Sequence, residues 1–571
     1  MIKGTSASPG IALGRVLLLE QKDLNIENKN IDDVELEEKR FRASIEKSRK
    51  ELIEIKEKVL KELGEKKATI FEAHLMVLQD PELIDGTIEK IRNEKKSCEF
   101  ALYELRNTFI EMFQSIEDEY MRERALDIKD VTDRIIRNIL GEQNADLANI
   151  KKEAILACHD LTPSDIANMA KGKVLGFITN LGGRTSHSSI MARSMEIPGV
   201  VGLKNITSKV KNNDFIILDG ESGEIIINPD EETKKKYIEL KKEEERKQNE
   251  LRSLIGKDTK TIDGHQVELS GNIGTPNDIH GLIRNDAEGV GLYRTEFLYM
   301  DKENFPSEEE QFDAYKKLLQ AMAPKPIVIR TFDIGGDKEL SYLQMDKEMN
   351  PFLGYRAIRI CLDKVDTFKT QLRALLKVSV YGNLRIMFPM ISSLEELLSA
   401  KDILEEVKKE LTLEGIAFSK EIQVGMMIEV PSAAIISDIL AKHVDFFSIG
   451  TNDLIQYTCA VDRTNEKINH LYNQFNPAVL KLIKLVVDNA HREGKWVGMC
   501  GEAAGDKRMI PILLGMGLDE FSMSPISILP ARKLITSIKL EDAKLLADKV
   551  LKMGTAKEIE SLLEEFKLKY L

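Results

Sequence analysis

The second part of the chain repeats one pattern, in which a short apolar segment alternates with a longer segment that has helical spacing of apolar residues. Short apolar segments that alternate with helices are typical of parallel strands. The pattern predicts a (β/α)8 barrel of the TIM type, with an open doubly wound sheet as the competing architecture. The eight expected strands are 267–272, 289–296, 326–333, 384–390, 424–430, 445–452, 496–501 and 520–524.

Several unusual polar residues decide between these two architectures. Each lies at or just past the carboxyl end of a predicted strand, which is where barrels of this type carry their catalytic groups. We therefore favour the barrel, over residues 259–571. The polar residues concerned are Arg294, Arg330, Glu429, Asn452, Asp453 and Cys500.

The first part of the chain predicts a different, α/β multidomain organisation. Strand-like segments at 10–19, 154–157, 174–178 and 215–218 flank a long, charged, glycine-poor stretch whose apolar residues recur at helical spacing. This indicates a β/α domain with an inserted helical subdomain, and the run of Glu and Lys that follows it predicts an exposed linker helix. The expected divisions are 1–20 and 146–229 for the β/α domain, 21–145 for the helical subdomain, 230–258 for the linker helix and 259–571 for the barrel.

Length and charge exclude several classes of protein. A chain of 571 residues exceeds what one hydrophobic core supports, and a formal net charge of −13 argues against a general nucleic-acid binder. No segment approaches the roughly 20 apolar residues of a membrane span, and no apolar signal core opens the chain, so membrane insertion and secretion are not expected. The five scattered cysteines predict free thiols in a cytoplasmic protein.

Residues 182–193 place His187 after two glycines, at the start of an apolar-periodic segment and among hydroxyl side chains. A helix that begins near Ser186 has unpaired N–H groups and the positive end of its dipole there, so it would stabilise an anion on His187 without a metal. A neutral imidazole nitrogen is also a good phosphoryl acceptor. His187 is therefore a candidate nucleophile, and the alternative is a capping or core histidine.

Arg294 and Arg330 lie in predicted strands whose other residues are mostly apolar, and each needs an anion because these neighbours would bury it. A guanidinium group matches phosphate or carboxylate oxygens in bidentate fashion, and Arg463 in a later loop could supply a third. The alternative for each arginine is an ion pair with a carboxylate of the barrel.

Glu429 and Asp453 follow two adjacent predicted strands. Hard oxygen ligands of this kind suit Mg²⁺, which takes one or two carboxylates and completes its shell with water and substrate oxygens. Salt bridges to the nearby arginines are the alternative. Cys500 would keep its proton at neutral pH and could act as a general acid, or it could be an inert buried thiol, and the residues alone leave these two roles open.

Taken together, these segments resemble enzyme I of the bacterial phosphoenolpyruvate:sugar phosphotransferase system, almost from end to end. The segment around His187 and the segment 447–454 are highly specific to enzymes that use phosphoenolpyruvate. The matching segments are 4–10, 71–74, 182–193, 330–338, 350–359, 428–431, 448–456 and 498–502.

The resemblance implies a reaction. The barrel would bind phosphoenolpyruvate and Mg²⁺, and His187 would take the phosphoryl group on Nε2 and pass it to a histidine of the phosphocarrier protein HPr, with pyruvate as the other product. By matching position, Cys500 would protonate the enolate of pyruvate, and Glu429 and Asp453 would bind Mg²⁺. The expected substrate-binding residues are Arg294, Arg330, Arg356, Asn452, Asp453 and Arg463.

The same resemblance implies partners and motion. The helical insert would dock HPr, on a face around Glu72, His74, Asp80 and Glu82, although His74 fits a plain helix surface equally well. His187 would have to reach the barrel and then turn to HPr, so the linker 230–258 should permit a large swing. The family is dimeric through its barrel, which implies a homodimer.

Two other functions compete with this one. Pyruvate phosphate dikinase and phosphoenolpyruvate synthase share the phosphohistidine and barrel parts, but they also need an ATP-binding domain for which this chain has no matching segment. A scaffold protein could keep the fold and bind HPr without turnover. Retention of the charged residues in the barrel argues against a scaffold, and release of pyruvate would distinguish the two.

Overall fold

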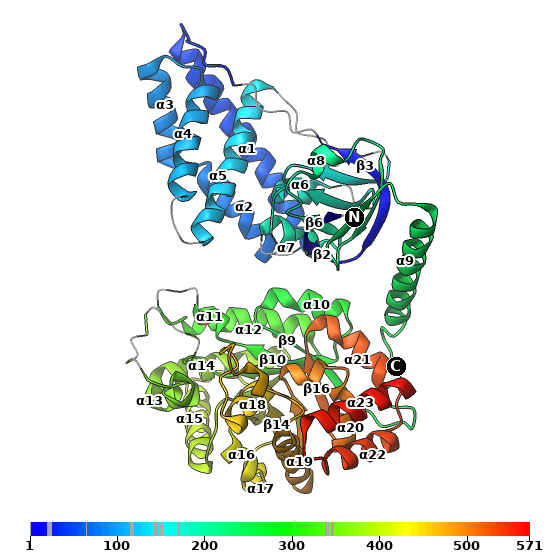
Figure 1. The fold of residues 1–571 in the computed structure, drawn as a ribbon. Helices are drawn as coiled ribbons and strands as arrows, with labels where there is room; N and C mark the ends of the chain where they lie inside the picture. Colours follow the sequence, from blue (N-terminus) through cyan, green and yellow to red (C-terminus); the bar gives the residue numbers. More distant parts are fainter. Residues whose placement is uncertain are drawn as a thin grey trace. The chain divides into compact units, whose positions relative to one another are not determined.

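The computed structural model shows two compact units, Met1–Lys247 and Gln248–Leu571 (Figure 1). The described residues are 2–19, 26–63, 65–114, 119–141, 147, 150, 152–169, 172–183, 186–300, 302, 304–336, 338, 340, 342–343, 346 and 348–570.

The first unit contains a mixed sheet in the order β1-β8-β7-β3-β4-β5-β6-β2. Its central strand β3 pairs in parallel with β4 and antiparallel with β7. The four predicted strand segments correspond to β3, β4, β5 and β7, and the short strands β1, β2, β6 and β8 were not predicted. The strands are β1 Ile2–Lys3, β2 Thr5–Ser8, β3 Ile11–Leu18, β4 Ala154–Cys158, β5 Val174–Thr179, β6 Gly199–Val201, β7 Phe215–Asp219 and β8 Glu224–Ile227.

A bundle of helices is inserted between two neighbouring strands of this sheet. β3 and β4 pair directly, yet the helices α1 to α5 separate them in the sequence, and Figure 1 shows these helices packed side by side. Their predicted apolar positions are buried, among them Phe41, Leu52 and Val59. The predicted insertion of a helical bundle is thus confirmed. The helices are α1 Val34–Leu63, α2 Glu65–Val77, α3 Pro81–Glu94, α4 Cys98–Gln114 and α5 Glu119–Leu140.

The expectation that His74 lies on a helix surface is wrong. His74 is 0% exposed, because its ring packs edge-on against Phe71 and its Nε2 lies 3.2 Å from Oδ1 of Asp127 on α5. Its Nδ1 lies 3.7 Å from Asp130, which also accepts a hydrogen bond from Ser164 Oγ at 3.1 Å. His74 therefore joins the helical insert internally and is not available to a partner.

Short helices complete the β/α domain, and one long exposed helix follows it. The short helices are α6 Pro163–Asn168, α7 His187–Ser194 and α8 Ile206–Lys209. Helix α9, Glu231–Arg252, has no buried residue and consists mainly of Glu and Lys. An exposed helix was predicted in this segment.

The second unit is a closed barrel of eight parallel strands in the order β9 to β16, with β16 pairing back to β9. All eight predicted strands are present, so the barrel is confirmed and the open sheet is excluded. Most of the predicted ranges run past the carboxyl end of the strand, because they included polar residues that begin the following loop. The strands are β9 Glu268–Ile273, β10 Gly289–Arg294, β11 Pro326–Arg330, β12 Asn383–Phe388, β13 Gln423–Ile428, β14 Phe446–Ile449, β15 Trp496–Met499 and β16 Glu520–Met523.

Helices surround the barrel and bury its outer apolar face. The α-helices are α10 Ile279–Arg284, α11 Phe297–Met300, α12 Glu308–Met322, α13 Ile358–Asp363, α14 Val365–Val378, α15 Leu394–Leu413, α16 Pro431–Ile435, α17 Ser437–Leu440, α18 Thr451–Cys459, α19 Pro477–Arg492, α20 Met509–Met516, α21 Ile528–Ile535, α22 Leu540–Val550 and α23 Ala556–Tyr570. The 3-10 helices are η2 Pro276–Asp278, η3 Pro351–Leu353, η4 Ser379–Tyr381, η5 Ala441–His443, η6 Asn469–Leu471, η7 Glu502–Gly505 and η8 Pro525–Ser527. Within the described part of the chain, none of the helices has both the length and the apolar character that a bilayer span requires.

Candidate active site

The polar residues singled out in the sequence lie at one rim of the barrel. Arg294 and Arg330 are the last residues of β10 and β11 and are neighbours in the strand register. Glu429 and Cys500 each follow the last residue of their strand, β13 and β15. Because the carboxyl ends of parallel strands share one rim, these side chains converge on the mouth of the barrel. Asn452 and Asp453, in the first turn of α18, follow β14 at the same rim.

Asp333 is the hub of a buried ion-pair network at this mouth, and the sequence did not identify it. Its Oδ2 lies 2.9 Å from Arg330 and 3.0 Å from Lys338, and its Oδ1 accepts from Arg356 Nη2 at 3.1 Å. Glu296 accepts from both Arg330 and Lys338 at 2.8 Å. For Arg330 and Arg356, an ion pair with barrel carboxylates is therefore what the structure shows.

The cations of this network and burial act in opposite directions on the pKa values of its two carboxylates. Burial alone would raise the pKa of Asp333, but Arg330, Lys338 and Arg356 outweigh it and hold that pKa well below its ordinary value. The pKa of Glu296 is lowered in the same way by Arg330 and Lys338, against burial. Both carboxylates are therefore ionised at neutral pH. The arginines still have free donors, since the Nε groups of Arg330 and Arg356 are buried without a hydrogen-bond partner among the described residues.

Glu429 has a different environment from these paired carboxylates. It is 1% exposed, and its Oε1 accepts from the Met390 backbone N–H at 2.6 Å. Burial, and then the negative charges of Asp453 and Asp333, raise its pKa to about 8, although Arg330 and other cations act in the opposite direction. No described residue donates a hydrogen bond to Oε2. Glu429 and Asp453 therefore form a pair of carboxylates at this rim in which the charge of Asp453 disfavours the ionisation of Glu429.

Cys500 is a buried thiol beside this pair. It is 3% exposed, and its Sγ lies 3.9 Å from the carbonyl oxygen of Ile449. Burial raises the pKa of Cys500 to about 11, although Ser448 and Arg330 lower it and Glu429 contributes to the rise. At neutral pH the thiol is therefore protonated, as a general acid must be.

Arg294 differs from the other arginines of the mouth. Its side chain is half-buried and forms no hydrogen bond or ion pair with any residue in the described ranges. An unpaired guanidinium beside Arg330 is free to bind an anion without breaking an existing contact. Arg463 lies in the loop after α18, where its backbone N–H donates to Gln456 Oε1 at 3.1 Å.

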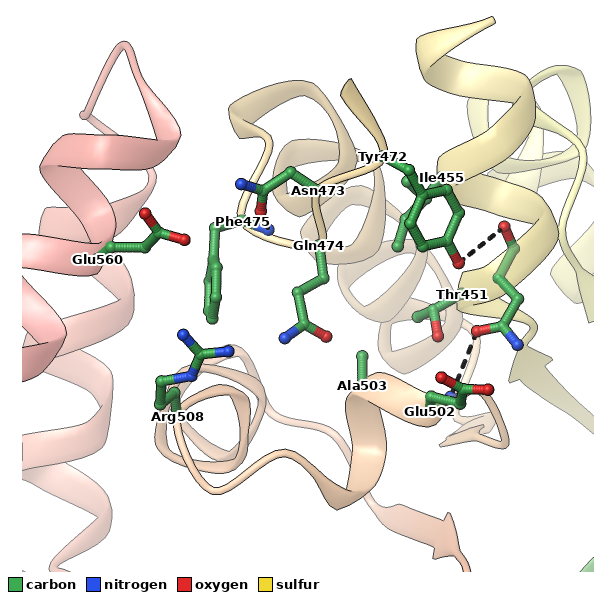
Figure 2. Close-up of a pocket in the computed structure, with 11 residues that line it drawn as sticks. Thr451, Ile455, Tyr472, Asn473, Gln474, Phe475, Glu502, Ala503, Arg508 and Glu560 are labelled. Carbon is green, nitrogen blue, oxygen red and sulfur yellow. Dashed lines mark hydrogen bonds between the residues drawn. The ribbon is translucent and has the colours of Figure 1, made fainter. Parts of the chain in front are cut away.

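A pocket of about 230 Å³ opens beside α18 (Figure 2). Tyr472, which the sequence did not identify, donates from its hydroxyl to the backbone oxygen of Asn452 at 3.3 Å. Burial raises the pKa of Tyr472 to about 12, and the positive charge of Arg463 acts against that rise. Asn452 Oδ1 accepts from the Glu502 N–H at 3.5 Å, so Asn452 is fixed from two sides.

The loop that contains His187 leads directly into helix α7. The structure describes His187 by its backbone, as the first residue of this helix, and Arg184 and Thr185 of the same motif lie outside the described residues. Ser186 caps the helix, since its Oγ accepts from the Ser189 N–H at 3.3 Å. The predicted position of His187 at a helix N-terminus is thus what the structure shows.

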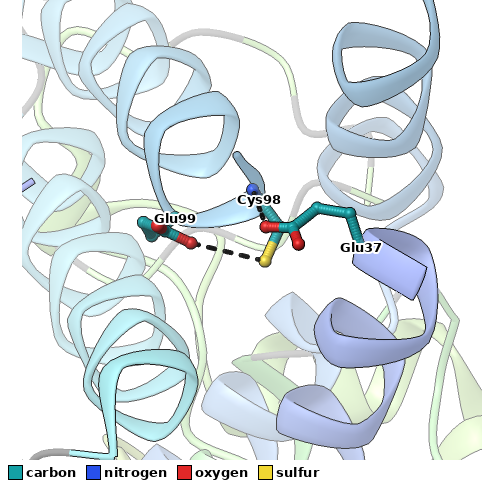
Figure 3. Close-up of side chains that lie close together, drawn as sticks. All are labelled: Glu37, Cys98 and Glu99. Atoms are coloured by element: carbon teal, nitrogen blue, oxygen red, sulfur yellow. Dashed lines mark hydrogen bonds between the residues drawn. The ribbon is translucent and has the colours of Figure 1, made fainter. Parts of the chain in front are cut away.

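A separate cluster, Glu37, Cys98 and Glu99, has the composition of a metal site but lies in the helical bundle (Figure 3). Arg40 Nη1 donates to both oxygens of Glu37 at 2.8 Å, and the Cys98 N–H donates to Glu37 Oε1 at 2.9 Å. Burial alone would raise the pKa of Glu37, but these contacts outweigh burial and lower it. The arginine already balances the carboxylate, so we interpret this cluster as a structural ion pair.

Three family models match the chain. One described as the PEP-binding domain of PEP-utilising enzymes matches residues 248–540, one described as the N-terminal part matches 3–124, and one described as the mobile domain matches 150–223.

Relatives named phosphoenolpyruvate-protein phosphotransferase match over nearly the whole chain. The Bacillus subtilis protein is 54% identical over 564 residues, and the match covers 99% of each chain. The Staphylococcus carnosus protein is 51% identical over 565 residues, again with 99% of each chain covered. A solution structure titled enzyme I is 46% identical, with a TM-score of 0.38, and covers 43% of this chain and 100% of its own.

Proposed function

Because this chain belongs to the phosphoenolpyruvate-protein phosphotransferases, enzyme I of the bacterial phosphotransferase system, we propose that its barrel mouth binds phosphoenolpyruvate and that His187 receives the phosphoryl group. The enzyme carries out phosphoenolpyruvate-dependent phosphotransfer. The observation that carries the residue assignment is the convergence of arginines, two carboxylates and a protonated thiol at one rim of the barrel.

In this proposal the arginines bind the anionic substrate. Arg294 needs no rearrangement, since it has no partner among the described residues, and Arg330 and Arg356 can each offer the Nε donor that is buried without a partner. Phosphoryl transfer depends mainly on positioning and on neutralisation of developing charge, which fixed guanidinium groups supply. Arg463 and Asn452 would contact the substrate from the side of α18.

Family membership implies a divalent metal cofactor, and we assign it as Mg²⁺, held by Glu429 and Asp453. The donor set fits, because two carboxylates are hard oxygen ligands and Glu429 Oε2 has no hydrogen-bond donor among the described residues. The negative charge of Asp453 contributes to the raised pKa of Glu429, and a bound cation would offset it. When bound, the ion would neutralise charge on the phosphoryl oxygens.

The chemical step divides between two residues of this chain. A bond forms between His187 Nε2 and phosphorus while the bond from phosphorus to the enolate oxygen breaks. The Cys500 thiol then gives its proton to the methylene carbon of the enolate, so an S–H bond is replaced by a C–H bond and pyruvate is formed. The N-terminus of α7 would stabilise the phosphohistidine, since its first N–H groups have no partner within the helix.

A phosphocarrier protein is the acceptor that this family implies, and we propose that it is HPr, docked on the helical insert. Asp80 and Glu82 are exposed at the start of α3, and Met76 nearby is 70% exposed. Acidic residues around an apolar side chain suit a basic partner surface. His74 is excluded from this face by its burial.

Three further properties belong to the same proposal. The exposed helix α9 would allow the phosphohistidine domain to turn between the barrel and HPr. The family relationship supports a homodimer formed through the barrel. A cytoplasmic location fits a protein whose described helices include none that could span a membrane.

The test is release of pyruvate from phosphoenolpyruvate and Mg²⁺ without nucleotide, measured by a coupled dehydrogenase. We expect one equivalent of pyruvate per chain without HPr, and continued turnover with HPr and a downstream acceptor. No pyruvate from the parent would contradict the proposal and indicate a scaffold, while a requirement for ATP would indicate a dikinase.

A further inference from the structure

Asn272, in strand β9, forms hydrogen bonds with the backbone next to the catalytic thiol. Its Nδ2 donates to the Cys500 carbonyl oxygen at 2.9 Å and to the Ser522 carbonyl oxygen at 3.3 Å. The Ser522 hydroxyl donates to Asn272 Oδ1 at 2.5 Å. Since both carbonyl oxygens are acceptors only, the amide has one possible orientation. Ser522 is fully buried, and Asn272 is half-buried.

The bond from Asn272 to Cys500 is not part of the barrel ladder. β9 pairs with β16 through their backbones, in a register that places Gly271 beside Met523. Cys500 follows β15, which is one strand further round the barrel. The Asn272 side chain therefore reaches past β16 to the residue after β15, and barrel closure already has its own backbone pairs.

With this bond, both the carbonyl and the N–H of Cys500 have hydrogen-bond partners. On the other side, the Cys500 N–H donates to the Ile449 carbonyl oxygen at 3.1 Å. The next residue, Gly501, is packed so tightly that a Cβ there would lie 1.7 Å from Thr451 Oγ1. The peptide after Cys500 thus lies between α18 and Asn272, and loss of the Asn272 bond removes the contact that fixes its carbonyl.

We infer that Asn272 is a positioning residue that fixes the direction of the Cys500 thiol for proton transfer, and that Ser522 fixes the Asn272 amide. This inference rests on the proposed role of Cys500 as the acid. The direction of Sγ depends on the backbone of its own residue, and a displacement of about 1 Å can cost roughly 100-fold in rate. Asn272 touches neither substrate nor metal in this account, so its effect is confined to the step that Cys500 performs.

The experiment compares Asn272→Ala, Asn272→Asp and Ser522→Ala with the parent and with Cys500→Ala. A matched control is Asn489→Ala, because Asn489 is a buried asparagine that likewise donates from its side-chain amide, to Ser437 Oγ at 2.8 Å, but on an outer helix of the barrel. The measurements are kcat and KM for phosphoenolpyruvate, the solvent deuterium isotope effect on kcat, and the melting temperature.

For Asn272→Ala and Asn272→Asp we expect kcat to fall by about 10- to 100-fold, with KM within about threefold of the parent and a larger solvent isotope effect. Ser522→Ala, which keeps the amide, should show a smaller change in the same direction. Asn489→Ala should lower the melting temperature without changing the isotope effect. An Asn272 variant whose kcat and isotope effect match those of the Asn489 control would overturn the inference.

Failure of the proposed function gives a different result. If Cys500→Ala retains the parent's kcat and isotope effect, Cys500 is not the acid and the inference falls with that role. If Cys500→Ala loses activity while both Asn272 variants keep it, the acid stands and the positioning role of Asn272 is refuted. If Asn272→Ala fails to fold, Ser522→Ala decides, and an unchanged isotope effect there refutes the inference.

Discussion

Arg294 and Arg330 are neighbours at the same rim, but only one of them belongs to the ion-pair network of the barrel. Arg330 is 6% exposed and pairs with Glu296 at 2.8 Å and Asp333 at 2.9 Å, whereas Arg294 is half-buried and has no partner among the described residues. We therefore predict that Arg294→Gln and Arg330→Gln weaken use of phosphoenolpyruvate similarly but differ in their effect on stability.

The expected magnitudes follow from these contacts. Removal of one partner from a buried ion pair costs about 3 kcal/mol or more, and each 1 kcal/mol lowers the melting temperature of a large domain by roughly 2–4 °C. Arg330→Gln should therefore melt about 6–12 °C below the parent. Arg294→Gln should change stability by less than about 0.5 kcal/mol, as at an unpaired surface position.

In the proposed site, both substitutions would remove a charge-assisted hydrogen bond to the substrate. Such bonds contribute about 1.5–3 kcal/mol, so kcat/KM for phosphoenolpyruvate should fall roughly 10- to 150-fold in each variant. The assays are thermal unfolding of the substrate-free proteins and initial rates of pyruvate release. Equal destabilisation by the two substitutions, or an unchanged kcat/KM for Arg294→Gln, would refute the reasoning.

Three other predictions concern single groups. Because burial raises the pKa of Cys500 to about 11, the rate at which iodoacetamide alkylates this thiol should be low at pH 8 and should rise with pH until about 11. Labelling is followed by peptide mass spectrometry, and fast labelling at pH 8 would contradict the buried environment. Glu429→Gln should leave the melting temperature at pH 7 unchanged, because the raised pKa of Glu429 already favours its neutral form. The same variant should abolish the effect of Mg²⁺ on the melting temperature, and a normal Mg²⁺ response would show that Glu429 is not a metal ligand. Asp519 lies 2.8 Å from His491 and raises the pKa of that histidine. The pair therefore stabilises the fold below about pH 6.5, and this contribution is lost as pH rises through the raised pKa. For an exposed pair the contribution is less than about 1 kcal/mol. Urea unfolding of His491→Gln should show the loss at pH 5.5 and not at pH 9; an equal loss at both values would contradict it.

The barrel could be predicted from the sequence because its strands are buried on both faces. Such strands appear as short apolar runs, as in Val424 to Ile428, and each is followed by a segment with helical spacing of apolar residues. The missed strands of the first unit give no such signal. β6, Gly199–Val201, has three residues, and its place in the sheet depends on pairing with β5 and β2.

The candidate site was only partly predictable, for a related reason. A polar residue that ends an apolar run is visible in the sequence, and this identified Arg330 and Glu429. The partner of such a residue is not visible, because it comes from another element. Asp333 ends the predicted strand 326–333, but its cationic partners were not visible in the sequence. Asn272 forms its hydrogen bond with Cys500 across 228 positions of sequence. The burial of His74 depends in the same way on Asp127, 53 positions away.

The most direct test of the central claim is the mass of the intact protein after incubation with phosphoenolpyruvate and Mg²⁺ without nucleotide, beside His187→Ala. We predict one acid-labile phosphoryl group on the parent, removed by HPr, and none on the variant. A parent that gains no phosphoryl group would contradict the transferase mechanism, and a gain on both proteins would show that another residue is the acceptor.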